Sequence, residues 1–157
     1  MDKKKIRVYV DTSVIGGCYD EEFELYSNLL IEEFCRGKKI IITSEILMNE
    51  LGNAPDHVKN ILLKIPVNYS EHVLLTDEVE SLAYLYRSRG IVPEKSEADS
   101  LHIALATIYK ADVLVSWNFK HIVNFERIHL INAVNLEYNY SQIDIRSPQE
   151  VLSYYEE

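Results

Sequence analysis

The stretch IRVYVDTSVIGG, from Ile6 to Gly17, joins a short apolar strand to a turn of hydroxyl and glycine residues through one aspartate, Asp11. Alternating apolar residues predict a central strand, and open α/β sheets hold their ligands beyond the carboxyl ends of such strands. Asp11 is therefore a candidate functional residue. The alternative is that its carboxylate only caps the following turn, as aspartate commonly does.

Strand and helix patterns alternate along the rest of the chain, without a repeat or a long linker. This order predicts an α/β fold, with a mainly parallel sheet and helices on its faces. We expect strands at 6–10, 39–43, 113–116 and 128–131, and helices at 21–35, 45–51, 56–63, 76–89, 96–109 and from 147 towards 155.

A length of 157 residues fits one domain, so we expect residues 1–157 to fold as a single unit. The chain carries 16 basic and 25 acidic residues, a net charge of −9, which gives no general attraction for nucleic acid. A nucleic-acid role would need a bound cation or a local basic group. Three such groups are Lys3 to Arg7, Arg36 to Lys39, and Lys120 with His121 and Arg127, although each also fits an ordinary solvated surface.

The two cysteines, Cys18 and Cys35, match no zinc spacing and give little support for a disulfide framework. The apolar run before Asp11 is too short for a signal peptide, and no window reaches the roughly 20 apolar residues that span a bilayer. We therefore expect a soluble cytoplasmic protein that does not enter the membrane.

A second candidate acid, Asp99, lies in the first turn of the helix predicted at 96–109. Ser96 and Asp99 have the spacing of a capping box, with aspartate in place of glutamate. The helix dipole would also keep this carboxylate ionised, which suits a ligand of a hard metal ion. Capping and metal binding compete for the same oxygens.

Two further acids, Glu45 and Glu50, lie on the helix predicted at 45–51 and point about 140° apart on it. Glu50 lies beside the apolar residues Leu47 and Leu51, so we prefer it as the functional acid. Either glutamate could instead be an ordinary solvated side chain.

Asn118 follows the strand predicted at 113–116, where an amide oxygen could bind a divalent ion or orient a water molecule. A turn asparagine is the plainer interpretation. His102 and His121 have no second histidine or cysteine at ligand spacing, so core or surface roles are favoured for both.

Four segments together resemble the PIN-domain proteins, particularly the bacterial and archaeal toxins of the VapC type. They are VYVDTSVIGG (8–17), TSEILMNEL (43–51), EADSLHIALA (97–106) and ADVLVSWNFKHI (111–122). The resemblance covers nearly the whole chain. It implies a three-layer α/β/α sandwich whose carboxylates hold Mg²⁺ or Mn²⁺.

By motif position, the resemblance implies that Asp11, Glu50 and Asp99 are the family's catalytic and metal-binding acids. Asn118 stands in the place of the fourth acid, and His121 falls where many members carry another aspartate. This sequence therefore brings fewer negative ligands than the fullest family pattern.

The implied function is metal-dependent cleavage of RNA, as the toxin of a type II toxin-antitoxin pair with a cognate antitoxin protein. A non-catalytic PIN-like module that binds RNA or protein is the alternative. A dehalogenase-like phosphatase is disfavoured, because Ser13 replaces the second aspartate of its Asp-x-Asp motif. Tyr138, Tyr140, Tyr154 and Tyr155 could form a homodimer or partner surface, although packing of the terminal helix also explains them.

Overall fold

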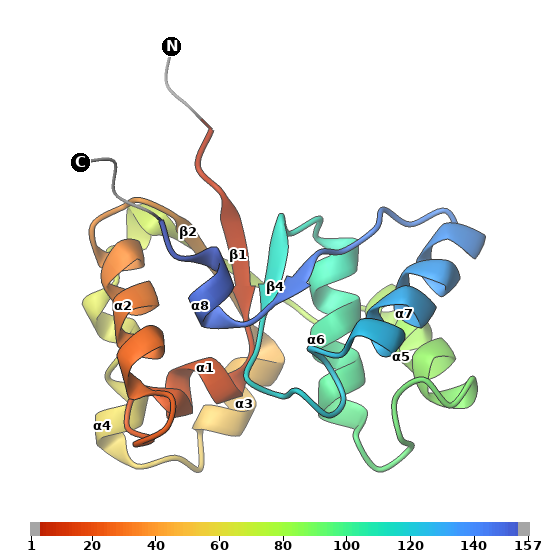
Figure 1. Ribbon diagram of the computed structural model, residues 1–157, viewed down its shortest axis with the longest axis horizontal. Helices are drawn as coiled ribbons and strands as arrows, with labels where there is room; N and C mark the ends of the chain where they lie inside the picture. The colour runs from red at the N-terminus through yellow and green to blue at the C-terminus, as the bar shows by residue number, and fades with distance from the viewer. Residues whose placement is uncertain (1–3, 154–157) are drawn as a thin grey trace.

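The computed structural model describes residues 4–153, which form a five-stranded sheet flanked by helices (Figure 1). The strand order is β3-β2-β1-β4-β5, and all neighbouring strands are parallel. The strands are β1 (Arg7–Val10), β2 (Ile40–Ser44), β3 (Ser70–Val73), β4 (Val113–Val115) and β5 (Ile145–Arg146).

The first strand is the central one. Tyr9 pairs with Ile42 of β2 on one side and with Leu114 of β4 on the other. Val8, Tyr9 and Val10 are completely buried. The sequence prediction that Asp11 follows a central strand is therefore confirmed.

Helices and shorter turns of helix connect the strands. The α-helices are α1 (Thr12–Gly17), α2 (Glu24–Cys35), α3 (Glu45–Leu51), α4 (Asp56–Lys59), α5 (Asp77–Ser88), α6 (Glu97–Ile108), α7 (Phe125–Glu137) and α8 (Pro148–Val151). The 3₁₀ turns are η1 (Leu62–Lys64) and η2 (Val67–Tyr69).

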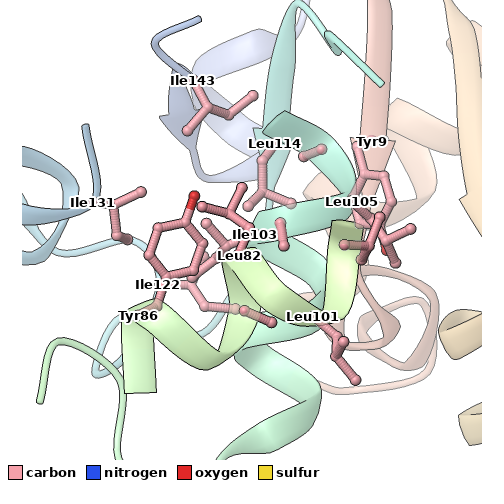
Figure 2. Close-up of a cluster of buried hydrophobic side chains, with 14 of the residues drawn as sticks. Tyr9, Leu82, Tyr86, Leu101, Ile103, Leu105, Leu114, Ile122, Ile131 and Ile143 are labelled. Atoms are coloured by element: carbon pink, nitrogen blue, oxygen red, sulfur yellow. The ribbon is translucent and has the colours of Figure 1, made fainter. Parts of the chain in front are cut away.

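The alternation of side chains along β1 divides the core into two layers. Tyr9 points into a cluster formed with helices α5, α6 and α7, where Figure 2 shows it beside Leu105 and Leu114. Val8 and Val10 point into a second cluster beneath α1, α2 and α3. Helices therefore cover both faces of the sheet (Figure 1), and the three-layer α/β/α fold predicted from the sequence is confirmed.

Two helices begin at a residue whose side-chain hydroxyl caps them. The Ser44 hydroxyl accepts a hydrogen bond from the Leu47 amide at 3.1 Å, and the Thr76 hydroxyl accepts one from the Val79 amide at 3.2 Å. These bonds satisfy amides that the first turn of a helix leaves without a partner. The Ser44 bond fixes the start of α3, which carries Glu45 and Glu50.

The prediction of a strand at 128–131 was wrong, because these residues lie within α7. The Asn124 carboxamide oxygen caps the helix by accepting from the Arg127 amide at 3.2 Å. Ile131 and Val134 then bury themselves three residues apart, as on one face of a helix. A run of isoleucine and leucine favours a strand when taken alone, but the buried residues of this segment have helical spacing.

Two strands were missed, and several boundaries differ. In β3 only Val73 is buried, and β5 has two residues, so neither gives a clear apolar alternation. The helix expected at 56–63 ends at Lys59, α2 begins at Glu24 rather than residue 21, and α8 ends at Val151. The expected continuation of the last helix to residue 155 lies partly outside the described residues.

Of the four tyrosines considered for a partner surface, Tyr138 and Tyr140 lie in the described region. The Arg89 guanidinium lies over the Tyr138 ring at 5.6 Å, and the Tyr140 hydroxyl donates to Glu78 at 2.8 Å. Tyr154 and Tyr155 lie outside the described residues. Within residues 4–153, no helix combines the length and apolar character needed to cross a membrane.

Candidate active site

Three of the sequence-predicted residues meet at the carboxyl edge of the sheet. Asp11 follows β1, Asn118 follows β4, and Asp99 lies in the first turn of α6. In Figure 1 this edge lies below the arrowheads of β1 and β4, close to α1 and α3. Parallel strands make this convergence a consequence of topology.

Asp11 is held by two serine hydroxyls and is only 3% exposed. Ser13 donates to its Oδ1 at 2.6 Å, and Ser116 donates to its Oδ2 at 2.5 Å. The Ser13 oxygen also accepts from the Trp117 amide at 2.9 Å, which ties the turn after β1 to the turn after β4. Asp11 stands at the N-cap position of α1 without a side-chain capping hydrogen bond of normal geometry, although the Val14 amide is close enough to lower the pKa of its carboxyl.

Burial raises the pKa of Asp11, because the ionised carboxylate loses its hydration. The nearby imidazole of His102 and the hydroxyls of Ser116 and Ser13 oppose this rise but do not cancel it. A buried acid whose ionised form is destabilised is typical of a functional site, where a cation would restore the balance.

Asp99 faces Asn118 instead of capping its own helix. The Asn118 Nδ2 donates to Asp99 Oδ2 at 3.1 Å. The Ser96 amide, which a capping box would require, donates to the Pro93 carbonyl at 2.8 Å. The Asp99 carboxylate is therefore not used as a helix cap.

The orientation of the Asn118 amide group is set by its own turn. Its Oδ1 accepts from the backbone amides of Lys120, at 3.2 Å, and His121, at 3.0 Å. Turning the amide group over would point its NH₂ at two N–H donors, so the nitrogen must face Asp99. In this arrangement Asn118 presents a donor to Asp99, and its oxygen would have to leave both amides to bind a metal ion.

The acids of this edge influence one another. Burial raises the pKa of Asp99, and the negative charges of Asp11 and Glu50 raise it further. The imidazoles of His102 and His121 oppose this rise. Mutual repulsion among carboxylates is the electrostatic condition that a divalent cation relieves.

Glu50 and Glu45 have separate surroundings. Glu50 Oε1 accepts from Thr12 Oγ1 at 2.8 Å, so Glu50 lies beside the turn that follows Asp11. Glu45 Oε2 accepts from the Leu75 amide at 2.8 Å, in the connection between β3 and α5. The geometry thus brings Glu50, and not Glu45, into the neighbourhood of Asp11 and Asp99.

His102 is a central residue of the site, although no second histidine or cysteine lies at ligand spacing from it in the sequence. It is 2% exposed; its Nε2 lies 2.6 Å from Glu50 Oε1, and its Nδ1 lies 2.6 Å from the Tyr9 hydroxyl. The Tyr9 hydroxyl in turn lies 2.7 Å from Ser44 Oγ, the cap of α3. This chain of hydrogen bonds connects the core of the sheet to both ends of α3.

The ionisation state of Glu50 fixes the direction of its hydrogen bond with His102. Burial would raise the Glu50 pKa, but the hydrogen bond and charge of His102 outweigh it and lower that pKa. An ionised carboxylate only accepts, so His102 Nε2 must carry a proton and donate it to the bond. One clue was available in the sequence: His102 lies three residues after Asp99, and therefore close to the same face of one helix.

His121 lies beside this network rather than within it. Its backbone amide binds Asn118, while its Nδ1 is buried without a hydrogen-bond partner in the described part of the chain. Burial, followed by the charge of Arg127, lowers the pKa of His121. The position is occupied by a group that favours the neutral form, where the resemblance implied that many relatives carry an acid.

The donor chemistry of the site fits Mg²⁺ or Mn²⁺, because these hard cations prefer carboxylate oxygens. Among residues 4–153, no three histidine, cysteine, aspartate or glutamate side chains converge closely enough to enclose an ion by themselves. Magnesium is usually bound by one or two carboxylates, completed by waters and substrate phosphates. The arrangement thus fits an open site better than a closed metal cage.

The fold and this edge together define the class of the protein as a PIN-like α/β fold. The chain is structurally similar to VapC toxins over most of its length. One similar solved structure is VapBC2 from Rickettsia felis, bound to a DNA fragment from its promoter. It has a TM-score of 0.57 and 16% identity, and the match covers 90% of this chain and 98% of the other.

A second similar structure is VapC20 from Mycobacterium tuberculosis, described as a toxin that cleaves the sarcin-ricin loop. It has a TM-score of 0.55 and 14% identity, and the match covers 73% of this chain and 92% of the other. No protein-family model and no curated protein sequence matches the chain. At these identities the likeness concerns the fold, so the activity must be argued from the site.

Proposed function

We propose that this protein is a divalent-metal-dependent ribonuclease of the VapC type. The observation that carries the proposal is the group of coupled acids, Asp11, Asp99 and Glu50, at the carboxyl edge of a sheet with the VapC fold. The substrate class is supported by the description of VapC20 as a toxin that cleaves the sarcin-ricin loop.

Each residue of the site has a distinct role in this proposal. Asp11 and Asp99 hold the cation directly, Asn118 orients Asp99, and Glu50 completes the negative charge from α3. Mg²⁺ or Mn²⁺ would supply Lewis acidity, lowering the pKa of a water and neutralising charge on the phosphate. The serines at Asp11 fix the direction of its oxygens before substrate binds.

Two observations favour the alternative, a non-catalytic module that binds RNA or protein. The Asn118 oxygen is engaged by its own turn, and no closed set of three ligands forms among the described residues. An open site of one or two carboxylates is nevertheless usual for Mg²⁺, which is why we prefer the nuclease.

The first test is cleavage of end-labelled RNAs, both single-stranded and folded, by the purified protein. We expect cutting with Mn²⁺ or Mg²⁺ and none after addition of a chelator. The same ions at millimolar concentration should raise the melting temperature, because a ligand of the folded state stabilises it by mass action. Binding of RNA without cutting in either metal would establish the non-catalytic alternative.

We expect His102 to act as a positioning residue for Glu50. A His102→Leu substitution removes the donor to Glu50 and should weaken Mn²⁺ binding about 10-fold, as the loss of an outer-shell partner typically does. His102→Gln should restore much of that affinity, because its amide nitrogen can reach a similar point. Mn²⁺ titration by calorimetry checks both variants, and equal loss in Leu and Gln would mean that the imidazole has only a packing role.

We also propose a protein antitoxin as a partner, since one similar structure is a VapBC complex. A homodimer stays a prediction from the tyrosines of the sequence. Size-exclusion chromatography with light scattering would measure the oligomeric state.

A further inference from the structure

Most arginines of the described chain have a carboxylate partner, and three cations beside the site do not. Arg7, Arg89 and Arg146, for example, pair with Glu71, Glu137 and Asp144. In contrast, Lys95, Lys120 and Arg127 form no ion pair within residues 4–153. Their charge is therefore available to an external anion.

Two of these cations line one surface hollow of about 430 Å³. Lys120 is exposed, while Arg127 is half-buried and donates from its guanidinium to the Ile91 carbonyl. That bond holds the planar guanidinium in place without neutralising it. Glu126 is an acid that also lines the hollow, beside Asn124 and Leu130.

The hollow is connected to the proposed metal site through one side chain. Asn118 donates to Asp99 and accepts from the backbone amide of Lys120. Two hydrogen bonds through Asn118 therefore connect the backbone of Lys120 to the Asp99 carboxylate. The turn from Asn118 to Lys120 thus joins the edge that carries Asp99 to the rim of the hollow.

We infer that the Lys120–Arg127 hollow is a phosphate subsite that holds the RNA strand next to the scissile bond. This inference rests on the proposed function and adds a path for the substrate. The fixed fork of arginine and the mobile ammonium of lysine are both suited to phosphate oxygens. A chain with a net charge of −9 gives no general attraction for RNA, so a local cationic group without an ion-pair partner has a large effect on where RNA binds.

The test measures RNA affinity in an Asp11→Asn background, where we expect cleavage to be about 100-fold slower or more. Fluorescence anisotropy with a labelled single-stranded RNA is recorded in Mg²⁺ at several salt concentrations. Lys120→Gln should reduce the slope of log affinity against log salt by about 0.7, the value for one phosphate contact on a single strand. Extrapolated from 1 M, that slope corresponds to about eightfold weaker binding at 50 mM salt.

Two further variants make the result specific. Lys110→Gln removes the same charge just beyond the C-terminal end of α6, whereas Asp99 lies in the first turn of that helix. This variant should leave both the salt slope and the RNA affinity unchanged. Arg127→Lys keeps the charge but removes the planar fork, and should weaken binding at a nearly constant slope. Because Lys120 is exposed and makes no side-chain hydrogen bond in the described structure, its substitution should not affect folding.

The outcomes separate this inference from the proposed function. Wild-type protein that cuts RNA, combined with equal binding by Lys120→Gln and Lys110→Gln, would overturn the subsite and leave the nuclease standing. If the hollow bound an acidic peptide and its substitutions left RNA affinity unchanged, the phosphate subsite would also be overturned. Failure of the protein to bind RNA at all would overturn both.

Discussion

Replacement of Asp11 by asparagine should lower the rate of RNA cleavage about 100-fold or more, as expected when a charged group that holds a catalytic cation is lost. Asparagine has nearly the same shape, and the Ser13 and Ser116 hydroxyls can rotate to meet its amide. Asparagine lacks the negative charge that attracts the cation. Initial cleavage rates over a range of Mn²⁺ concentrations measure the loss.

The same substitution should not destabilise the metal-free protein. Burial raises the pKa of Asp11, so near neutral pH its ionised form costs folding free energy that the neutral amide does not. We therefore expect an equal or higher melting temperature for Asp11→Asn in chelator. Glu97→Gln, an exposed acid in the first turn of α6, is the matched control and should keep wild-type activity. Lost activity together with a large fall in melting temperature would instead make Asp11 a structural residue.

Replacement of Glu33 by glutamine should cost about 3–5 kcal/mol of unfolding free energy, because it leaves a buried ammonium without its anion. Glu33 Oε1 lies 2.6 Å from Lys39 Nζ, and both side chains are about 5% exposed. Ser153 also donates to Glu33 through its hydroxyl at 2.7 Å. The pair fixes α2 to the start of β2 and to the segment after α8.

The control for this prediction is Glu32→Gln, on the same helix. Glu32 pairs with Arg36 in an exposed ion pair, whose loss should cost about 1 kcal/mol or less. Urea unfolding of both variants at neutral pH measures the difference. Similar costs for the two substitutions would show that the Glu33 pair contributes no more than a surface pair.

Acid should reduce the effect of Glu33→Gln. Burial would raise the Glu33 pKa, but bonds from Lys39 and Ser153 lower it overall. Since the folded-state pKa lies below the unfolded value of about 4.3, this stabilisation is complete above that value. It is lost as pH falls through the lower folded-state pKa, so the two proteins should become more alike below about pH 4.

The central part of the fold could be predicted because local pattern and tertiary environment agree there. The alternation around Tyr9 and the caps at Ser44 and Thr76 specify their elements within a few residues. The strand β3 could not be found in this way, because only Val73 of it is buried. Its place at the sheet edge depends on pairing with β2, which a local pattern does not contain.

The candidate site, too, could be predicted from the sequence only in part. Asp11 and Asp99 could be selected because they follow a strand and begin a helix, positions where ligands gather. The contacts of His102 with Tyr9 and Glu50 join residues 93 and 52 positions apart, and no spacing rule predicts them. The engagement of the Asn118 oxygen likewise depends on its local geometry, and the sequence allowed both a metal ligand and a turn asparagine at this position.

The central claim is that Asp11 and Asp99, with Glu50 beside them, hold a divalent cation at the carboxyl edge of the sheet. The most direct measurement is calorimetric titration of Mn²⁺ into the wild type, Asp99→Asn and Glu97→Gln. We predict saturable binding by the wild type and Glu97→Gln, and at least about 10-fold weaker binding by Asp99→Asn. Equal Mn²⁺ affinity in all three proteins, or no binding by the wild type, would contradict the claim.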